Sequence, residues 1–279
     1  IYGTAPSERD TDGDGFFDGW EIRQDRDPLS HDVLLDLDGD GVPTVYERYW
    51  GSDPGSAASV PPPQAFVFVD NRCTNAAQNG SAEAPWADLQ HALDAAPDYG
   101  IVRIAPGTYA GSFSLGGSAS RRMIVEAWDS DNPPTLFSGA TGGAPLLDVS
   151  GKDRLTLVRR LILRLHVPAS SAIASALSNW DTYGFSSGPV LDRLIVIGSA
   201  VPGESFAILL DAHNAGMRIQ NSLMAVPEGG TGVLAFFDQM FYFFPSLSAG
   251  PQCTGRLQIQ NCTFLCDGQA AAIWIDICS

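Results

Sequence analysis

The sequence predicts a mainly β protein, a solenoid of short strands that follows a small acidic module. Three observations point to this fold class: short apolar strands that end in turns recur along the chain, an amphipathic helix lies between two early strands, and an acidic loop is duplicated near the start. Antiparallel sandwiches of the immunoglobulin-like or jelly-roll type also contain many short strands and are the alternative. The helix between the two strands favours the solenoid.

Two acidic loops of one pattern lie near the start of the chain. Residues 10–21 read D-T-D-G-D-G-F-F-D-G-W-E, and residues 36–47 read D-L-D-G-D-G-V-P-T-V-Y-E. Both place aspartates at loop positions 1, 3 and 5, a glycine at position 6 and a glutamate at position 12. This is the order in which a calcium-binding loop supplies its oxygen ligands. The duplication predicts two calcium ions.

Each loop leads into a short helical pattern. The first contains Phe17 and Trp20, and the second contains Val45 and Tyr49. Helices this short are not stable alone, so we expect metal and a few aromatic contacts to hold them. The sequence therefore predicts that removal of calcium unfolds this segment.

Residues 10–54 resemble the bacterial thrombospondin type 3-like calcium repeats, which are relatives of EF-hand and dockerin loops. The resemblance rests on both loops and on the D-P-L and G-S-D-P segments that follow them. It implies that residues 1–54 form a duplicated calcium-binding module. The implied ligands of the first ion are Asp10, Asp12, Asp14, the Phe16 carbonyl, Asp18 through water, and Glu21. Those of the second ion are Asp36, Asp38, Asp40, the Val42 carbonyl, Thr44 in the water-mediated place, and Glu47.

The module departs from true EF-hand pairs in two ways. Pro43 lacks the backbone N–H that would bridge paired loops. In addition, no clear helical pattern leads into either loop. We therefore expect a static calcium brace and not a calcium-dependent switch.

Acidic residues outnumber basic ones, and most of the excess lies in this module. The chain has 32 Asp and Glu against 16 Lys and Arg, a net charge of −16, and residues 1–60 hold 14 of the acids and 4 of the bases. Such a field repels nucleic acid and anionic lipid and attracts divalent cations, so we expect no nucleic-acid partner. Because no run of 18 apolar residues is present, the sequence predicts no membrane span.

Cysteine use bears on the compartment. The five cysteines are Cys73, Cys253, Cys262, Cys266 and Cys278, without a C-x-x-C pair, and the four histidines are dispersed, so a zinc site is not predicted. Calcium is plentiful outside cells, where disulfides also persist. We therefore expect a secreted or cell-surface location, with the late cysteines either in one or two disulfides or free. The start at Ile1, without a signal-peptide pattern, predicts a processed or partial chain.

A linker rich in proline, serine and glycine, residues 55–64, precedes a second domain, residues 65–279. This domain opens with an alternating strand over 65–70, an amphipathic helix that starts at Pro85, and a strand over 101–109 that ends in P-G-T-Y.

The order of strand, W-x-x-L-x-x-A-L helix and P-G-T-Y strand resembles the start of pectate lyase-like right-handed parallel β-helix proteins. The resemblance implies a right-handed parallel β-helix whose open first coil is covered by the short N-terminal capping helix. His91 lies in that helix and is expected to be a capping or surface residue.

Four later segments support a repeating fold. They align at one apolar position each, namely Leu157, Leu191, Ile219 and Ile259, with steps of 34, 28 and 40 residues. The irregular period predicts coils that carry loops of different length. Asn221 and Asn261 resemble the bend asparagines of β-helix coils, and arginines take that place in the other two segments.

The sequence contains no recognisable catalytic motif, and we predict no catalytic residue. A β-helix polysaccharide lyase requires an Arg or Lys base and neutralisation of a uronate carboxylate, often by calcium. The side chains considered for these roles are Arg121, Arg122, Arg159, Arg160, Arg164 and Arg193, with Asp153, Asp192 and Asp211 as partners. Paired arginines on the outer face of a solenoid are ordinarily solvated. Lys152 lies at an apparent turn and is expected to be structural.

Two late features indicate partners. Residues 236–244, from Phe236 to Phe244, contain six aromatic side chains, which either fold over the flank of the solenoid or form a docking or sugar-stacking surface. Residues 271–279 read as an apolar strand without the polar terminal repeat that solenoids need for solubility. We therefore expect an incomplete solenoid or one whose last coil is covered by another chain or a second copy.

The expected function is that of an extracellular calcium-binding protein, secreted or on a bacterial surface, with a structural, adhesive or assembly role that includes filament formation. The alternatives are a β-helix polysaccharide lyase and a non-catalytic carbohydrate-binding protein that uses residues 236–244. The sequence leans against an enzyme.

Overall fold

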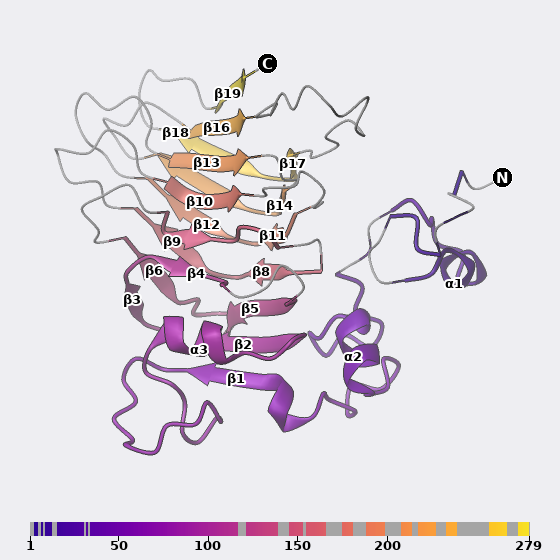
Figure 1. The fold of residues 1–279 in the computed structure, drawn as a ribbon, viewed down its shortest axis with the longest axis horizontal. Coiled ribbons are helices and arrows are strands. Elements are labelled where there is room, and N and C mark those ends of the chain that lie inside the picture. Colours follow the sequence, from indigo (N-terminus) through magenta and orange to yellow (C-terminus); the bar gives the residue numbers. More distant parts are fainter. Residues whose placement is uncertain are drawn as a thin grey trace, which may run out of the picture. The chain divides into compact units, whose positions relative to one another are not determined.

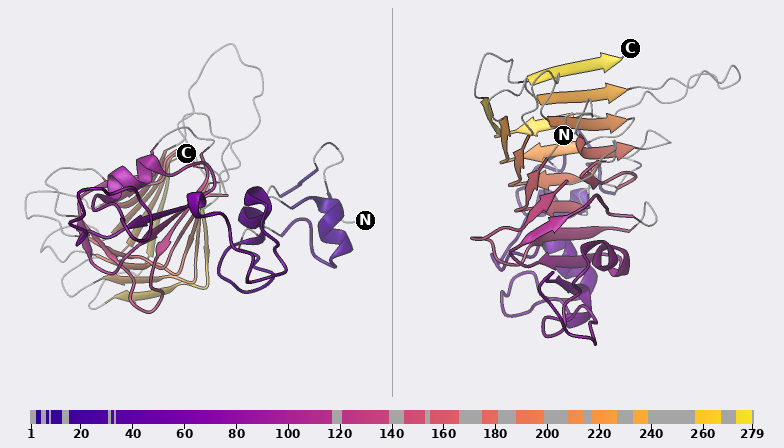
Figure 2. Two further views of the ribbon diagram at one scale, coloured as in Figure 1. Left: turned by 90° about the horizontal axis from the view of Figure 1, so that it is seen from below. Right: turned by 90° about the vertical axis from the view of Figure 1, so that its left-hand side faces the viewer.

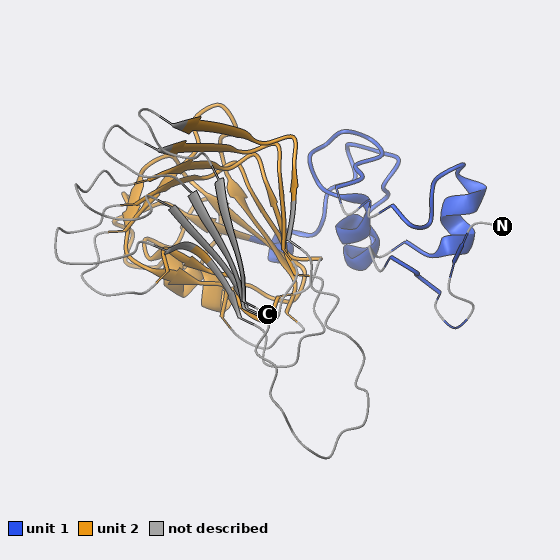
Figure 3. Cartoon of the chain, turned by 90° about the horizontal axis from the view of Figure 1, so that it is seen from above, with its two compact units in different colours: residues 1–66 blue, residues 67–279 orange. Residues whose placement is uncertain are grey.

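A computed structural model gives the structure of the chain. It describes residues 3–4, 7, 9–12, 16–30, 32, 34–116, 121–138, 145–152, 155–165, 175–180, 188–198, 208–213, 217–226, 233–238, 257–266 and 273–278. The chain divides into two compact units, residues 1–66 and 67–279 (Figure 3). Both acidic loops lie in the first unit.

Among its described residues, the first unit contains two short α-helices, each of which begins at position 9 of an acidic loop. Helix α1 spans Asp18–Arg23, α2 spans Thr44–Trp50, and a 3-10 turn, η1, spans Pro63–Ala65. Helix α2 ends at Gly51, whose left-handed φ of 77° is typical of a helix C-terminus. The predicted helices are therefore present. Within the described part of the chain, no helix has the length and apolarity needed to cross a bilayer.

The second unit is mainly β, and its strands form three sheets (Figure 1). The first sheet contains, in spatial order, β1 (Phe66–Val69), β2 (Gly100–Ile104), β5 (Met123–Ala127), β8 (Leu157–Arg159), β11 (Val190–Asp192), β14 (Met217–Gln220) and β17 (Leu257–Gln260). The second contains β3 (Thr108–Ala110), β6 (Thr135–Phe137), β9 (Ile162–Arg164), β12 (Ile195–Ile197), β15 (Leu223–Val226) and β18 (Thr263–Cys266). The third contains β4 (Phe113–Ser114), β7 (Leu147–Asp148), β10 (Ser175–Trp180), β13 (Ile208–His213), β16 (Val233–Asp238) and β19 (Ile273–Cys278).

Successive strands visit the three sheets in turn. From β2 onward, each set of three consecutive strands adds one strand to the first, second and third sheet, and this order repeats through β19. Figure 2 shows the resulting layers. Neighbours are parallel, as for β2 with β5, β3 with β6 and β4 with β7. The sandwich alternative is wrong, because those folds are antiparallel, and the prediction of a mainly β protein is confirmed.

Buried apolar side chains lie in register along the sheets. Val102, Val125 and Val158 are aligned in the first sheet, and Leu136 and Leu163 in the second. All five belong to one core cluster. Each such side chain contributes about 1.5–3 kcal/mol when fully buried, so these aligned rows are the main source of stability in this unit.

The register corrects one position of the predicted repeat. Leu191 pairs with Ile219, and Ile219 pairs with Ile259, as predicted. On its other side, Leu191 pairs with Val158 and not with Leu157. Leu157 and Val158 are both buried, so the alternation that separates the two faces of a strand is not visible in the sequence there.

Helix α3 (Leu89–Ala95) follows β1, but it begins later than Pro85. Its N-cap is Asp88, whose carboxylate accepts the N–H of His91 at 2.7 Å. Trp86 instead forms a β-bridge with Val69. His91 is exposed and lies edge-on to the Trp86 ring, with 4.2 Å between the ring centroids. The helix side chains that enter the core are Leu89, Ala92 and Leu93.

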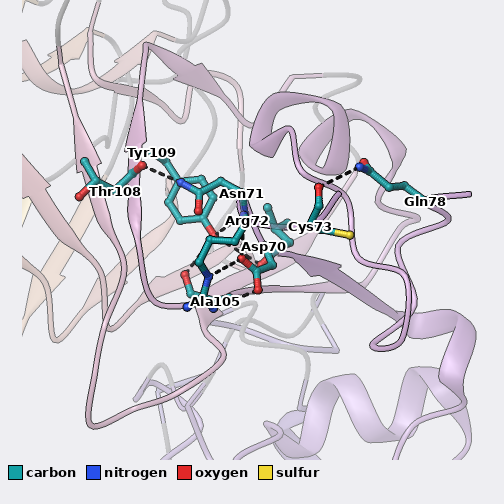
Figure 4. A network of polar contacts seen from close by, with 9 residues as sticks. Asp70, Asn71, Arg72, Cys73, Gln78, Ala105, Thr108 and Tyr109 are labelled. Atoms are coloured by element: carbon teal, nitrogen blue, oxygen red, sulfur yellow. Dashed lines mark hydrogen bonds and ion pairs between the residues drawn. The ribbon is translucent and has the colours of Figure 1, made fainter. Parts of the chain in front are cut away.

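The P-G-T-Y segment makes polar contacts with the turn after β1 (Figure 4). The Tyr109 hydroxyl donates to the Ala105 carbonyl at 3.0 Å, and Asn71 Nδ2 donates to the Thr108 carbonyl at 2.8 Å. A Cβ at Gly107 would lie 3.0 Å from Asn71 Oδ1, so glycine permits this close approach. Burial raises the pKa of Tyr109 to about 12, which keeps its hydroxyl a donor.

Candidate metal centre

The second acidic loop is shaped by its own aspartates. Asp36 accepts the N–H of Gly39 at 2.7 Å and that of Gly41 at 2.8 Å, and Asp40 Oδ1 accepts the N–H of Val42 at 2.7 Å. Gly39 and Gly41 have φ angles of 78° and 94°, which glycine adopts without strain. The glycines of the motif therefore permit the turn that brings the aspartates together.

Three aspartates converge in this loop and form what we call the aspartate triad: Asp36, Asp38 and Asp40. One carboxylate oxygen from each lies within 4.8 Å of those of the other two. Like charges at this distance repel one another. Carboxylate oxygens are the ligands that hard divalent cations prefer, so the triad could hold a metal ion.

Glu47, at loop position 12, distinguishes this cluster from an ordinary acidic turn. It lies in α2 and is fully buried, and neither carboxylate oxygen accepts a hydrogen bond from a described residue. Ser52 Oγ donates to the backbone carbonyl of Glu47 at 3.3 Å. Burial, and secondly the negative charges of the triad, raise the pKa of Glu47 to about 7. A cation would supply the counter-charge that a buried carboxylate needs.

The described part of the first loop shares a backbone hydrogen bond with the second loop. The N–H at position 9 donates to the carbonyl just before position 1, from Asp18 to Arg9 at 2.9 Å and from Thr44 to Leu35 at 2.7 Å. Glu21, at position 12, is fully buried like Glu47. Asp10 and Asp12 are described, whereas Asp14 lies outside the described residues.

In both loops the residue at position 2 donates a hydrogen bond to the side chain of the residue at position 9. Thr11 donates to the Asp18 carboxylate through its N–H and its hydroxyl, each at 2.7 Å. These bonds, the hydroxyl first, lower the pKa of Asp18. In the second loop, Leu37 N–H donates to Thr44 Oγ1 at 3.2 Å. These contacts give Asp18 and Thr44 a loop-bracing role that the expectation of water-mediated ligands did not include.

The side chains at loop position 7, Phe16 and Val42, are buried in both loops. Phe16 stacks on Trp20 with 4.8 Å between ring centroids, and the Arg48 guanidinium of α2 lies 5.0 Å from the Phe16 ring and 4.4 Å from the Trp20 ring. This cation–π contact joins the two loops. Arg48 was not predicted, because its ring partners Phe16 and Trp20 are distant from it in the sequence.

Arg159 is not the solvated surface residue that the sequence predicted. It is buried on β8, and its Nη2 lies 2.7 Å from Glu126 Oε2 on the neighbouring strand β5. Glu126 is also buried, and its Oε1 lies 3.0 Å from Arg103 Nε. Glu126 was not predicted, because the parallel register, and not sequence proximity, brings it to Arg159.

Other lyase candidates make structural contacts. Arg121 donates to the carbonyls of Asp94 and Leu115 at 2.7 and 2.8 Å. Arg122 lies 4.0 Å from the Asp98 carboxylate. Arg164 is exposed. Asp153 lies outside the described residues, and only the backbone of Asp211 is described.

Lys152 is buried, and its Nζ donates to the Gly116 carbonyl at 2.6 Å. The lysine therefore connects two loops, which agrees with the structural role expected of it.

The remaining sequence features are described in part. Phe236 begins a pair of aromatic residues in β16, whereas residues 239–244 lie outside the described residues. Cys73 and Cys262 are free thiols. Cys253 lies outside the described residues, and Cys266 and Cys278 are described in their backbone alone.

Comparison of the chain with models of protein families, with curated proteins and with solved structures found no match. The chemistry of the described residues is therefore the basis for assigning a function.

Proposed function

We propose that residues 1–54 are a calcium-binding module that braces an extracellular protein with a structural, adhesive or assembly role. The observation that carries the proposal is the buried Glu47 carboxylate beside the aspartate triad. A buried Glu47 carboxylate that accepts no hydrogen bond from a described residue, next to three converging aspartates, favours a divalent cation. Calcium accepts six to eight oxygen ligands, whereas magnesium ordinarily takes one or two protein carboxylates, so the number of oxygens favours calcium.

The shared frame of the loops supports a second ion in the first loop. Its ligands would be Asp10, Asp12, Asp14, the Phe16 carbonyl and Glu21. The buried Glu21 and the matching backbone hydrogen bonds at position 9 support this assignment. We infer a brace and not a switch, because Pro43 is the N-cap of α2 and the Arg48 guanidinium of α2 packs on the Phe16 and Trp20 rings of the first loop.

For the second unit we propose a right-handed parallel β-helix. Three parallel sheets that receive one strand each in a repeating order support this fold. Helix α3 would cover the first coil, which agrees with the place of its apolar side chains in the core. An extracellular location is the setting in which weak calcium modules remain loaded. A second copy or another surface protein remains the proposed partner.

Calcium titration of the whole chain by isothermal calorimetry tests the proposal. The wild-type chain is expected to bind two ions, and Glu47→Gln is expected to lose the ion of the second loop. Asp25→Asn is the matched control, because Asp25 is exposed in the same unit and its φ of 56° suits asparagine. It should bind calcium as the wild type does. Unchanged stoichiometry and affinity in Glu47→Gln would contradict the proposal.

Stability measurements separate a ligand from a merely structural glutamate. Without calcium, the first unit of Glu47→Gln should be folded to the same extent as that of the wild type or to a greater one, because a buried charge has been removed. With calcium, it should be less stable than the wild type, because binding stabilises the folded state. If Glu47 had only a structural role, Glu47→Gln would be less stable than the wild type under both conditions.

A further inference from the structure

One bend recurs between the first and second sheets of the second unit. After β8, β11, β14 and β17, a single residue adopts left-handed backbone: Arg160, Arg193, Asn221 and Asn261, with φ of 58°, 51°, 51° and 49°. The N–H groups of the first three donate to carbonyls in the next layer at 3.1, 3.1 and 3.0 Å. The four residues therefore form one column, with neighbours about 4.8 Å apart.

Asparagine suits this bend, and arginine does not. Asn261 Nδ2 donates to Asn221 Oδ1 at 2.7 Å, and Asn221 Nδ2 donates to Asp192 Oδ1 at 2.7 Å. Asparagine is also among the few non-glycine residues that favour left-handed backbone. Arg160 and Arg193 lack this preference and place like charges in adjacent layers. The bend itself therefore gives no reason for arginine.

Both guanidinium groups have donors available. Within the described part of the chain, the Arg160 side chain forms neither a hydrogen bond nor an ion pair. Burial, and secondly the positive charge of Arg159, lower its pKa. The Arg193 side chain is 58% exposed and forms an ion pair with Asp192, but the distance of 3.6 Å between Arg193 Nε and Asp192 Oδ2 is longer than a hydrogen bond, so the donors of the group remain available. The pair is a local cationic site in a chain of net charge −16.

Two adjoining surface hollows follow the column, and together we call them the Arg–Asn groove. The first, of about 350 Å³, is lined by Ser130, Pro133, Arg160, Arg193 and Ile195. The second, of about 550 Å³, shares Arg193 and Ile195 and continues along Leu194, Asn221, Ser222, Leu223, Asn261 and Thr263. The groove is cationic at one end, carries amides and hydroxyls at the other, and has no aromatic residue among those that line it.

We propose that the Arg–Asn groove binds an acidic oligosaccharide. A sugar carboxylate is held between Arg160 and Arg193, because a guanidinium forms paired hydrogen bonds with a carboxylate. The neutral part of the ligand lies along the asparagine and hydroxyl end, where amides and hydroxyls both donate and accept. A nucleic acid fits less well, because it requires cations along its length and aromatic platforms for its bases. This site does not depend on the calcium module.

The test replaces both arginines by asparagine, which is the residue at the next two bends, Asn221 and Asn261. Arg160→Asn with Arg193→Asn should fold and melt at the wild-type temperature or above it, because asparagine accepts the bend. Arg164→Asn is the matched control, since Arg164 is exposed on β9 and lines neither hollow. Calorimetry at low salt measures binding of a hexasaccharide of alternating glucuronate and N-acetylglucosamine. An uncharged N-acetylglucosamine hexamer is the reference ligand.

The affinity of the double variant for the acidic hexasaccharide is expected to fall by about tenfold or more, since each charge-assisted contact is lost. The control variant and the Glu47→Gln variant should bind it as the wild type does, so failure of the calcium proposal is distinguishable from failure here. Equal binding by the wild type and a correctly melting double variant overturns the proposal. So does wild-type binding that is no tighter for the acidic hexamer than for the neutral one, or tighter for single-stranded DNA of equal charge. Absence of binding to glucuronate, galacturonate and sulfated oligosaccharides alike also overturns it.

Discussion

The two units of the chain bury different kinds of side chain. The second unit aligns aliphatic side chains such as Val125 and Leu163 across parallel strands. The first unit buries Phe16 and Tyr46, but it also buries the carboxylates of Glu21 and Glu47. Buried carboxylates oppose folding unless a cation or donor compensates them. We therefore expect the second unit to be stable through its own side chains and the first unit to depend on a bound cation.

Removal of divalent cations should give the largest contrast between the units. Helices of six and seven residues do not persist alone, so a chelator should unfold the first unit and leave the second folded. Hydrogen exchange should show loss of protection in α1 and α2 and retained protection in β5 and β8. Far-UV circular dichroism and exchange that do not respond to chelator would show that the contrast is wrong.

A cavity in the second unit should have the next largest effect. Leu163→Ala removes a fully buried side chain from β9 and should lower the free energy of unfolding of that unit by about 2–5 kcal/mol. Denaturant unfolding with and without calcium measures it, with the neighbouring exposed Arg164→Asn as control. The loss should be the same in both conditions. A strong dependence on calcium would mean that the units are not stabilised separately.

The smallest effect is expected at the contact between the two loops. Arg48→Gln removes a cation from the faces of Phe16 and Trp20 and should destabilise the first unit by about 0.5–2 kcal/mol. Denaturant unfolding at saturating calcium measures this difference. Arg23→Gln, at an exposed position of α1, is the control and should change little. An equal loss in both variants would indicate a general effect of charge.

Local patterns were predictable from the sequence, and contacts between distant segments were not. The acidic loops, α1 and α2 follow from glycine and carboxylate spacing within a few residues. The parallel sheets were predicted in outline, but the pairing of Leu191 with Val158 was not, because both faces of β8 are buried. Asp88 was available as an N-cap signal and marks the true start of α3. The Glu126 partner of Arg159 lies on another strand, where sequence spacing carries no information.

The buried position of Lys152 has a consequence for chemical labelling. It is the only lysine in the chain, and in the folded second unit its ammonium group is enclosed and donates to backbone carbonyls. An amine-directed reagent can therefore reach a lysine side chain only when this part of the unit opens. The rate at which Lys152 is acylated therefore measures how often this part of the unit opens, at a single natural site.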